Sequence, residues 1–205
     1  APKGLLPFLK SIPVWLKEKL FLRKLIFDNL KEIDPELKKK SVKLLFTEHH
    51  ISHAASAFYP SNLKESAILT IDGVGEWCTA SICMGKDKKI EIIKELHFPH
   101  SVGLLYSAFT YYLGFRVNSG EYKLMGLAPY GIENCEETKS FVKKIKNTIV
   151  DIKKDGSIFL NQKYFKYTYG LKMINNKKFK QLFGLSVRKE EEHLSQSHCN
   201  LALAI

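Results

Sequence analysis

Residues 48–86 read EHHISHAASAFYPSNLKESAILTIDGVGEWCTASICMGK, and this stretch determines the expected fold. Its first part, 48–58, is rich in His and Ala and reads as a helix, which the following Tyr-Pro-Ser sequence should end because proline cannot continue a helix. Three strand-like apolar runs, separated by turn-forming residues, come next: 67–71, 79–84 and 90–98. We therefore predict a helix followed by an antiparallel three-strand meander.

Hydrophobic periodicity predicts further elements on either side of this stretch. Apolar residues recur at three-to-four spacing over 13–32, which indicates an amphipathic helix, and 42–47 is a strand candidate. That helix could lie on a membrane surface, but packing against the rest of a larger domain is the interpretation we favour. The pattern further along the chain predicts a helix at 102–112, an irregular Gly-rich segment at 119–131, a helix at 135–150 and only weak strand and turn patterns at 151–190.

The composition describes a folded globular protein and excludes several classes. The 205 residues are 45% hydrophobic and 26% charged, and no apolar run approaches the roughly 18 residues that a membrane-spanning helix needs. Four cysteines without a CxxC pair favour a reducing, cytoplasmic setting. The net charge of +11 suggests an anionic partner, but the lysines are dispersed and no recognition motif accompanies them, so we expect no specific nucleic-acid site. Both ends lack the capping pattern of a natural terminus, so we expect a fragment of a longer chain.

Two histidines and one aspartate form a candidate metal site. His49 and His53 are four residues apart, so on a helix their imidazoles project from the same face. Asp72 ends an apolar strand and could add a carboxylate, which would complete the two-His, one-carboxylate set associated with iron(II) and also used by zinc or manganese. Histidines of an Ala-rich helix are more often packing residues, and that alternative stays open. His50 lies about 100° round the helix and is interpreted as a packing or supporting residue.

Two glycine-containing segments are candidate ligand loops. The DGVGE sequence at 72–76 joins two strands, and its glycines would let backbone N–H groups approach a phosphate or carbonyl oxygen. An ordinary hairpin turn explains the same sequence equally well. The segment SGEYKLMGLAPYG at 119–131 places Glu, Lys and two Tyr among three glycines, which is unusual for a surface loop. No P-loop, GxGxxG or GxSxG motif is present.

Four ordered motifs together resemble the O-carbamoyltransferase family, whose members modify nodulation factors and the antibiotics cephamycin, novobiocin and tobramycin. The motifs are EHHISHAASAFYPS at 48–61, LTIDGVGEW at 69–77, PHSVGLLY at 99–106 and SGEYKLMGLAPYG at 119–131. The resemblance covers most of the chain after residue 40.

The resemblance implies an α/β fold, namely part of the actin-like ATPase or ribonuclease-H-like duplicated fold. Residues 1–65 would then close the first lobe, and residues 66–205 would begin the second lobe with an insertion. The family's C-terminal carbamoyl-phosphate-activating domain, its opening strands with a catalytic His and a later metal-binding Asp have no counterpart in this sequence. The resemblance therefore implies that this segment alone is inactive, and it leaves the catalytic residues unknown.

The resemblance also implies a chemistry. Family members use carbamoyl phosphate and ATP to form carbamoyl-adenylate, and they pass the carbamoyl group to a hydroxyl acceptor, here expected to be a sugar or an antibiotic-like small molecule. His49, His53 and Asp72 match the family's metal positions, with iron(II) as the expected ion. The residues that would line the adenylate site are Gly73, Gly75, Glu76, Ser119, Gly120, Glu121, Lys123 and Gly126. A homodimer is possible for the full-length protein.

Two other functions remain open at this point. A metalloprotein that makes threonylcarbamoyl-adenosine in tRNA would use the same metal-bearing helix, and the positive charge would favour RNA binding. The runs LTIDGVGEW and EYKLMGLAPYG favour the small-molecule branch. A non-catalytic basic binding module with incidental histidines is the second alternative.

Overall fold

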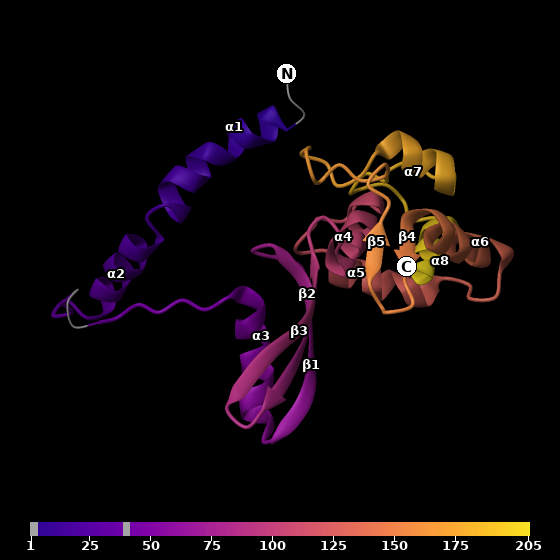
Figure 1. The fold of residues 1–205 in the computed structure, drawn as a ribbon. Helices are drawn as coiled ribbons and strands as arrows, with labels where there is room; N and C mark the ends of the chain where they lie inside the picture. Colours follow the sequence, from indigo (N-terminus) through magenta and orange to yellow (C-terminus); the bar gives the residue numbers. More distant parts are fainter. Residues whose placement is uncertain (1–3, 39–41) are drawn as a thin grey trace. The chain divides into compact units, whose positions relative to one another are not determined.

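The computed structural model describes residues 4–38 and 42–205, which form two compact units. The first unit is Ala1–Thr47 with Tyr169–Leu171, and the second is Glu48–Thr168 with Lys172–Ile205. The second unit contains a three-stranded antiparallel sheet and most of the helices, so the protein is a mixed α/β structure (Figure 1).

The first unit is helical, but its helix is interrupted. Helix α1 spans Leu5–Val14, a π-helical turn spans Trp15–Lys19, and α2 spans Leu22–Ile33. The prediction of one helix over 13–32 was therefore wrong in its start and its continuity. Pro13 has no N–H to donate to the preceding turn, and the Leu20 N–H donates to the carbonyl of Trp15, five residues back.

The predicted strand at 42–47 was also wrong, because these residues adopt no regular structure. A strand needs a partner for its backbone N–H and C=O groups. Among the described residues of the first unit, no second strand offers those groups. Within residues 4–38 and 42–205, no helix is long and apolar enough to cross a membrane.

The predicted helix and meander are confirmed in the second unit. Helix α3 spans His49–Phe58, and a 3₁₀ turn at Tyr59–Ser61 ends it. The sheet has the order β1-β2-β3, with the strands Glu65–Gly75, Cys78–Lys86 and Lys89–His97. Neighbouring strands are antiparallel and joined by two-residue turns, which is the connection typical of a meander.

Helix α3 covers one face of this sheet (Figure 1). Ala54 and Phe58 are buried on the helix, and they pack against Ile68 of β1 and Cys83 of β2. Gly85 is needed beneath Phe58, since a Cβ there would lie 2.7 Å from the aromatic ring. The strand face turned away from α3 has exposed apolar side chains, for example Leu69.

The remaining elements of the second unit follow the sheet along the chain. They are α4 (Val102–Tyr112), α5 (Glu121–Leu127), a 3₁₀ turn (Ala128–Tyr130), α6 (Glu136–Lys144), a π-helical turn (Ile145–Ile149), the β4–β5 hairpin (Val150–Ile152 and Ile158–Leu160), α7 (Asn176–Phe183) and α8 (Gln196–Ala204). The helices predicted at 102–112 and 135–150 are confirmed, although the second begins at Glu136 and ends in a π turn. The four cysteines are unpaired.

The segment predicted to be irregular at 119–131 instead contains helix α5. We predicted no helix because the segment contains three glycines, but the residues between them form a helix in which Leu124 and Leu127 are buried. The Glu121 carboxylate also accepts hydrogen bonds from the N–H groups of Asn118 and Gly120, which stabilises the turn before the helix. The local sequence therefore favours a helix once the backbone N–H groups before it are paired with the Glu121 carboxylate.

Helix α7 was missed in the region 151–190, where the sequence shows only weak strand and turn patterns. The helix is rich in lysine and has few apolar positions, but Phe179 and Phe183 lie four residues apart and are both buried. The side chain of Asn175 caps it by accepting the Lys178 N–H. Two aromatic residues and a cap are sufficient here because the core supplies the rest of the stability.

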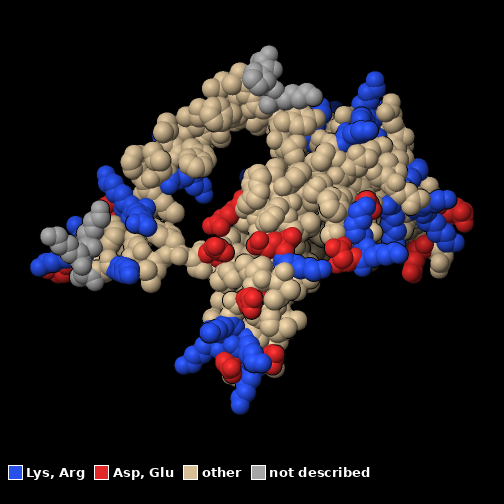
Figure 2. All heavy atoms as spheres, in the orientation of Figure 1, with Lys and Arg blue, Asp and Glu red and all other residues tan. Residues whose placement is uncertain are grey.

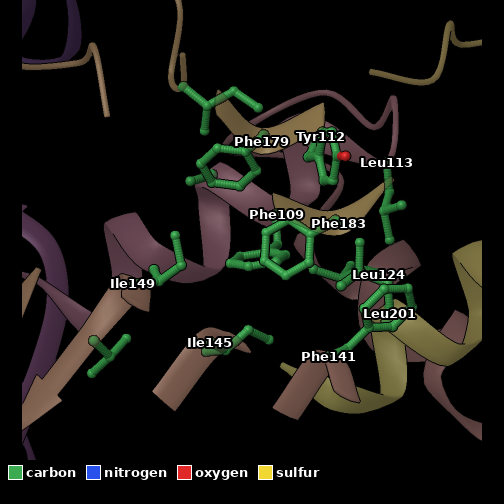
Figure 3. Packing of buried hydrophobic residues seen from close by; sticks show 14 of the residues in the cluster. Phe109, Tyr112, Leu113, Leu124, Phe141, Ile145, Ile149, Phe179, Phe183 and Leu201 are labelled. Atoms are coloured by element: carbon green, nitrogen blue, oxygen red, sulfur yellow. The ribbon is translucent and has the colours of Figure 1, made fainter. Parts of the chain in front are cut away.

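An aromatic cluster forms the centre of the main core (Figure 3). The Phe179 ring lies 5.6 Å from that of Phe109 and 5.1 Å from that of Tyr112, both on α4, and 5.6 Å from that of Phe183. The Tyr112 hydroxyl donates to the carbonyl of Leu185 at 2.5 Å, so its one polar atom is satisfied. This cluster joins α4 to the C-terminal helices.

On the face of the second unit shown in Figure 2, lysine and arginine side chains gather in groups that have acidic side chains between and beside them. One group lies at the turn between β2 and β3 and includes Lys86, whose amino group is 3.4 Å from the Glu65 carboxylate. Other lysines lie on α6, where Lys139 is paired with Glu136. Acidic side chains are thus interspersed with the basic ones.

We expect Phe179→Ala to lower the free energy of unfolding by about 3–5 kcal/mol, because it removes a fully buried ring from the cluster. Lys180→Ala, on the exposed side of the same helix, is the matched control and should change stability by no more than about 0.5 kcal/mol. Denaturant unfolding of both variants measures the difference. A loss below about 1 kcal/mol for Phe179→Ala would contradict the assignment of this ring to the core.

Candidate metal centre

Helix α3 and strand β1 bring together the three predicted metal ligands. His49 and His53 lie one helical turn apart near the start of α3, and Asp72 lies near the end of β1. One donor atom from each side chain lies within 4.8 Å of the others. The three side chains are 34–53% exposed, so an ion can reach them from solvent.

Two of the three distances between the donor atoms are close to those expected around a common ion, and the third is shorter. The Nε2 atom of His49 is 2.6 Å from Oδ2 of Asp72 and 2.9 Å from Nε2 of His53, and the third distance, His53 Nε2 to Asp72 Oδ2, is 3.6 Å. Ligand atoms about 2.1 Å from one ion are about 3.0 Å apart at right angles and about 3.4 Å apart in a tetrahedron. The 2.6 Å contact is a hydrogen-bond distance and would lengthen by about 0.4 Å if both atoms bound one ion at right angles, so a small side-chain movement would let the three residues share an ion.

One well-directed hydrogen bond satisfies only one of the two short contacts that His49 Nε2 makes. The single hydrogen on His49 Nε2 can point toward Asp72 or toward His53, but not toward both. If His53 donates to His49 instead, the lone pair of His49 is used and no hydrogen lies between His49 and the Asp72 carboxylate. A cation between the three atoms would use all three lone pairs, so these residues fit a divalent metal.

The Asp72 carboxylate is held in its ionised form. Burial alone would raise the pKa of this carboxyl group, but the hydrogen bond from the Gly73 N–H and the contact with His49 outweigh it and keep the pKa below its ordinary value. The Gly73 N–H donates to Oδ1 at 2.6 Å, which leaves Oδ2 facing the histidines. Asp72 therefore supplies a negative charge at neutral pH.

Gly75 leaves room for the imidazole of His49. A Cβ atom at this position would lie 2.1 Å from Cδ2 of His49, which is far inside van der Waals contact. The backbone of β1 therefore lies directly against the ring of His49. Gly73 differs, because a Cβ there would meet no atom within 4 Å.

His50 points into the protein, away from the donor atoms, as the interpretation of a packing or supporting residue requires. It is 2% exposed, and its Nδ1 atom lies 2.5 Å from the hydroxyl of Thr70 and 3.3 Å from that of Ser81. Burial, followed by the charge of the neighbouring His49, lowers the pKa of the His50 imidazole, which keeps it neutral. Its polar contacts fix α3 on the sheet.

The residues predicted to bind a nucleotide lie in two places. Gly73, Gly75 and Glu76 lie at the end of β1 and in its turn. The other five are in the turn before α5 or on that helix: Ser119, Gly120, Glu121, Lys123 and Gly126. Among the residues that the structure describes, no hydrogen bond or ion pair joins the two groups.

Several of these residues have a structural role that the sequence did not reveal. The Glu121 carboxylate accepts from the Ser107 hydroxyl at 2.8 Å as well as from the backbone before α5. Burial would raise its pKa, but these hydrogen bonds outweigh burial and lower it. A Cβ on Gly120 would lie 2.6 Å from the carbonyl oxygen of Arg116, so close packing also explains this glycine. Nucleotide binding at these positions stays a prediction.

Two residues beside the site were not predicted from the sequence. Ser101 precedes α4, and its hydroxyl lies within hydrogen-bond distance of the carbonyl groups of Asp72 and Gly73. Gly103 lies against the same peptide, with a Cβ position 2.5 Å from the Asp72 carbonyl oxygen. The sequence did contain a relevant pattern, since a serine directly before an apolar helix is a common N-cap.

Comparison with known proteins gives one family match and several relatives. Residues 1–204 match the family model described as Carbamoyltransferase N-terminus. The chain is 50% identical over 205 residues to the uncharacterized protein sll1178 of Synechocystis sp., an alignment that covers 100% of this chain and 32% of that protein.

Two nodulation proteins are also similar. The chain is 40% identical over 122 residues to NolNO of Sinorhizobium fredii, which is 59% of this chain and 17% of that protein. It is 39% identical over 83 residues to NolO of Bradyrhizobium diazoefficiens, which is 40% of this chain and 15% of that protein. The chain thus spans about a third or less of the length of these relatives.

Removal of any one of the three donors should weaken metal binding. We expect His49→Ala, His53→Ala and Asp72→Asn each to lower the affinity for iron(II) or manganese at least about tenfold, because three ligands share one ion. Titration calorimetry under anaerobic conditions measures the affinities, and circular dichroism checks folding. His97→Ala, which removes an exposed imidazole from β3, is the control and should bind as the wild type does. Equal affinity in all five proteins would show that the His pair is a packing feature.

Gly75→Ala should also weaken metal binding although it removes no ligand, because the added methyl group collides with the ring of His49. Gly73→Ala is the matched control, since its methyl group enters open space and its N–H is retained. The same titration should show a loss of about tenfold or more for the first variant and little change for the second. If both variants bind metal equally well, the present position of the His49 ring is not required for metal binding.

Proposed function

Because the chain belongs to the carbamoyltransferase family, whose N-terminal model it matches over residues 1–204, we propose that it is the metal-bearing part of a carbamoyltransferase. The enzyme would transfer a carbamoyl group to a hydroxyl of a small-molecule acceptor, such as a sugar or an antibiotic-like compound. The convergence of His49, His53 and Asp72 carries this proposal. The similarity to two nodulation proteins supports it.

We propose iron(II) as the ion, held by the two imidazole nitrogens and the carboxylate. Two histidines and one carboxylate with open positions are the ligand set associated with non-haem iron(II), and zinc or manganese can use it too. When bound, such an ion supplies a positive charge that polarises a carbonyl oxygen and stabilises the negative charge that develops on it. The open positions leave room for a substrate oxygen.

The proposed reaction is an acyl transfer from carbamoyl-adenylate, formed with carbamoyl phosphate and ATP. The acceptor oxygen forms a bond to the carbamoyl carbon, the bond from that carbon to the phosphate oxygen breaks, and AMP leaves. The hydroxyl proton must go to a base. His49 and His53 cannot act as this base while their lone pairs bind an ion, so their role is to bind and orient.

The adenylate would lie near the 72–76 turn and α5. The open space at Gly73 and at Gly126 would allow a ligand to approach the backbone closely, and Lys123 would contribute a positive charge toward phosphate. The fold proposed for the whole protein is the actin-like, ribonuclease-H-like one, with residues 1–65 in the first lobe and 66–205 in the second. The meander followed by helix α4 is compatible with it.

An activity assay on the full gene product that contains this chain tests the proposal. With carbamoyl phosphate, ATP and a panel of sugar and aminoglycoside acceptors, we expect AMP release coupled to a carbamoylated product. His53→Ala should lower product formation at least about tenfold, because the ion would be lost. Lys180→Ala is the control, since it lies on α7 and carries no proposed role.

Two results would overturn the proposed function. The first is a full-length protein that binds metal but forms no carbamoylated product with any hydroxyl acceptor. The second is transfer to adenosine in tRNA in preference to all small molecules, which would favour the tRNA-modifying alternative.

A further inference from the structure

The hydroxyl of Ser101 contacts the stretch of backbone that carries Asp72. Its Oγ atom lies 2.7 Å from the carbonyl oxygen of Gly73 and 3.1 Å from that of Asp72, so its single hydrogen is donated to this pair of carbonyls. The same oxygen accepts the N–H of Leu104 at 3.0 Å and caps α4. Ser101 is fully buried, so no water competes for these bonds.

This contact lies where the strand pairing fails. The β1–β2 register runs without interruption as far as Ile71 opposite Ala80, and it resumes only at Gly75 opposite Cys78. Residues 72–74 therefore form an irregularity in the ladder, and bulges of this kind redirect side chains near functional sites. Since β2 does not pair with these residues, another group must fix the backbone at Asp72, and Ser101 supplies it.

Gly103 places the first turn of α4 in direct contact with the same peptide. A Cβ there would lie 2.5 Å from the carbonyl oxygen of Asp72 and 2.8 Å from the nitrogen of Gly73. Only a residue without a side chain lets the helix come this close. The start of α4 therefore contacts the Asp72–Gly73 peptide in two ways. The Ser101 hydroxyl donates to the carbonyl groups of Asp72 and Gly73, and the backbone at Gly103 lies directly against the peptide.

The segment before α4 is itself held in place by distant parts of the chain. The Thr79 hydroxyl lies 2.6 Å from the carbonyl oxygen of His100, and the Tyr167 hydroxyl donates to the carbonyl of Pro99 at 2.8 Å. The ring of His100 accepts the N–H of Leu160 at 3.0 Å. Ser101 is thus fixed to β2 and to the C-terminal half of the second unit, and a fixed group can determine where Asp72 points.

We propose that Ser101 is a positioning residue, which holds the Asp72–Gly73 peptide so that the Asp72 carboxylate faces His49 and His53. Gly103 serves the same purpose, because the absence of a side chain lets the first turn of α4 lie against the Asp72–Gly73 peptide. The inference rests on the metal site of the proposed function, and it adds that the site depends on a helix which contributes no ligand. An ordinary N-cap would stabilise α4 without any effect on the ion.

Two N-cap variants distinguish these roles in the full gene product. Ser101→Ala removes the hydroxyl beside Asp72, whereas Asn175→Ala removes the cap of α7, and each should lower stability by removing one helix cap. We expect iron(II) or manganese affinity to fall about tenfold in Ser101→Ala and to stay unchanged in Asn175→Ala. If Ser101→Ala does not fold, Ser101→Gly replaces it, because glycine is tolerated at an N-cap better than alanine is.

A spectroscopic measurement separates positioning from general loss of stability. With saturating cobalt(II) as the probe, the visible absorption bands report the ligands and geometry of the site. The spectrum of Ser101→Ala should shift toward that of Asp72→Asn, and that of Asn175→Ala should match the wild type.

The outcomes of the two experiments are distinct. Weaker binding and a shifted spectrum for Ser101→Ala alone support the inference. Wild-type affinity and spectrum in Ser101→Ala overturn it and leave the metal site intact. Equal losses in both cap variants overturn it too, since stability alone would explain them. Failure of the wild type to bind iron(II), manganese or cobalt(II) overturns the proposed metal site and this inference with it.

Discussion

The packing of α3 against the inner face of the sheet is the constraint on which the candidate site depends. His50, Ala54 and Phe58 follow one another at four-residue spacing and are all buried. Because this face is fixed against the sheet, the rotation of the helix is fixed as well. His49 and His53, one position earlier, must then project to one side, toward Asp72 near the end of β1. The hydrogen bonds between His50 Nδ1 and the hydroxyls of Thr70 and Ser81 also fix the orientation of α3, because the rest of this contact is apolar and apolar contacts are not directional.

The large core stabilises the site indirectly, through α4. The far end of this helix carries Phe109 and Tyr112 into the aromatic cluster, while its first turn lies against the Asp72–Gly73 peptide. A helix that is fixed at one end by a well-packed core can hold its other end in a defined place. Helix α4 thereby links the core to the backbone that carries Asp72, one of the three partly exposed donors.

The parts that the sequence predicted correctly are those with a strong local pattern. The apolar runs between turn-forming residues predicted the sheet, and the Tyr-Pro-Ser sequence after Phe58 predicted the end of α3. The four-residue spacing of His49 and His53 indicated that they share a face. Helix α5 was missed because Gly120 precedes it and Gly126 interrupts it, and α7 was missed because lysines occupy many of its positions. The burial of Leu124 and of Phe179 explains why the two helices form. The contact of Ser101 with Asp72 joins residues 29 positions apart. A local sequence pattern cannot predict a contact between residues so far apart in the chain. The strand predicted at 42–47 shows the opposite error, since β propensity without a partner forms no strand.

The central claim is that His49, His53 and Asp72 hold one ion, and anomalous X-ray diffraction tests it most directly. Crystals of the full gene product are grown with iron(II) or manganese, and data are collected on both sides of the metal absorption edge. The account predicts one strong anomalous peak about 2.0–2.2 Å from both imidazole Nε2 atoms and from the nearer carboxylate oxygen. A well-diffracting crystal without that peak, or with the ion bound by other residues, would contradict it.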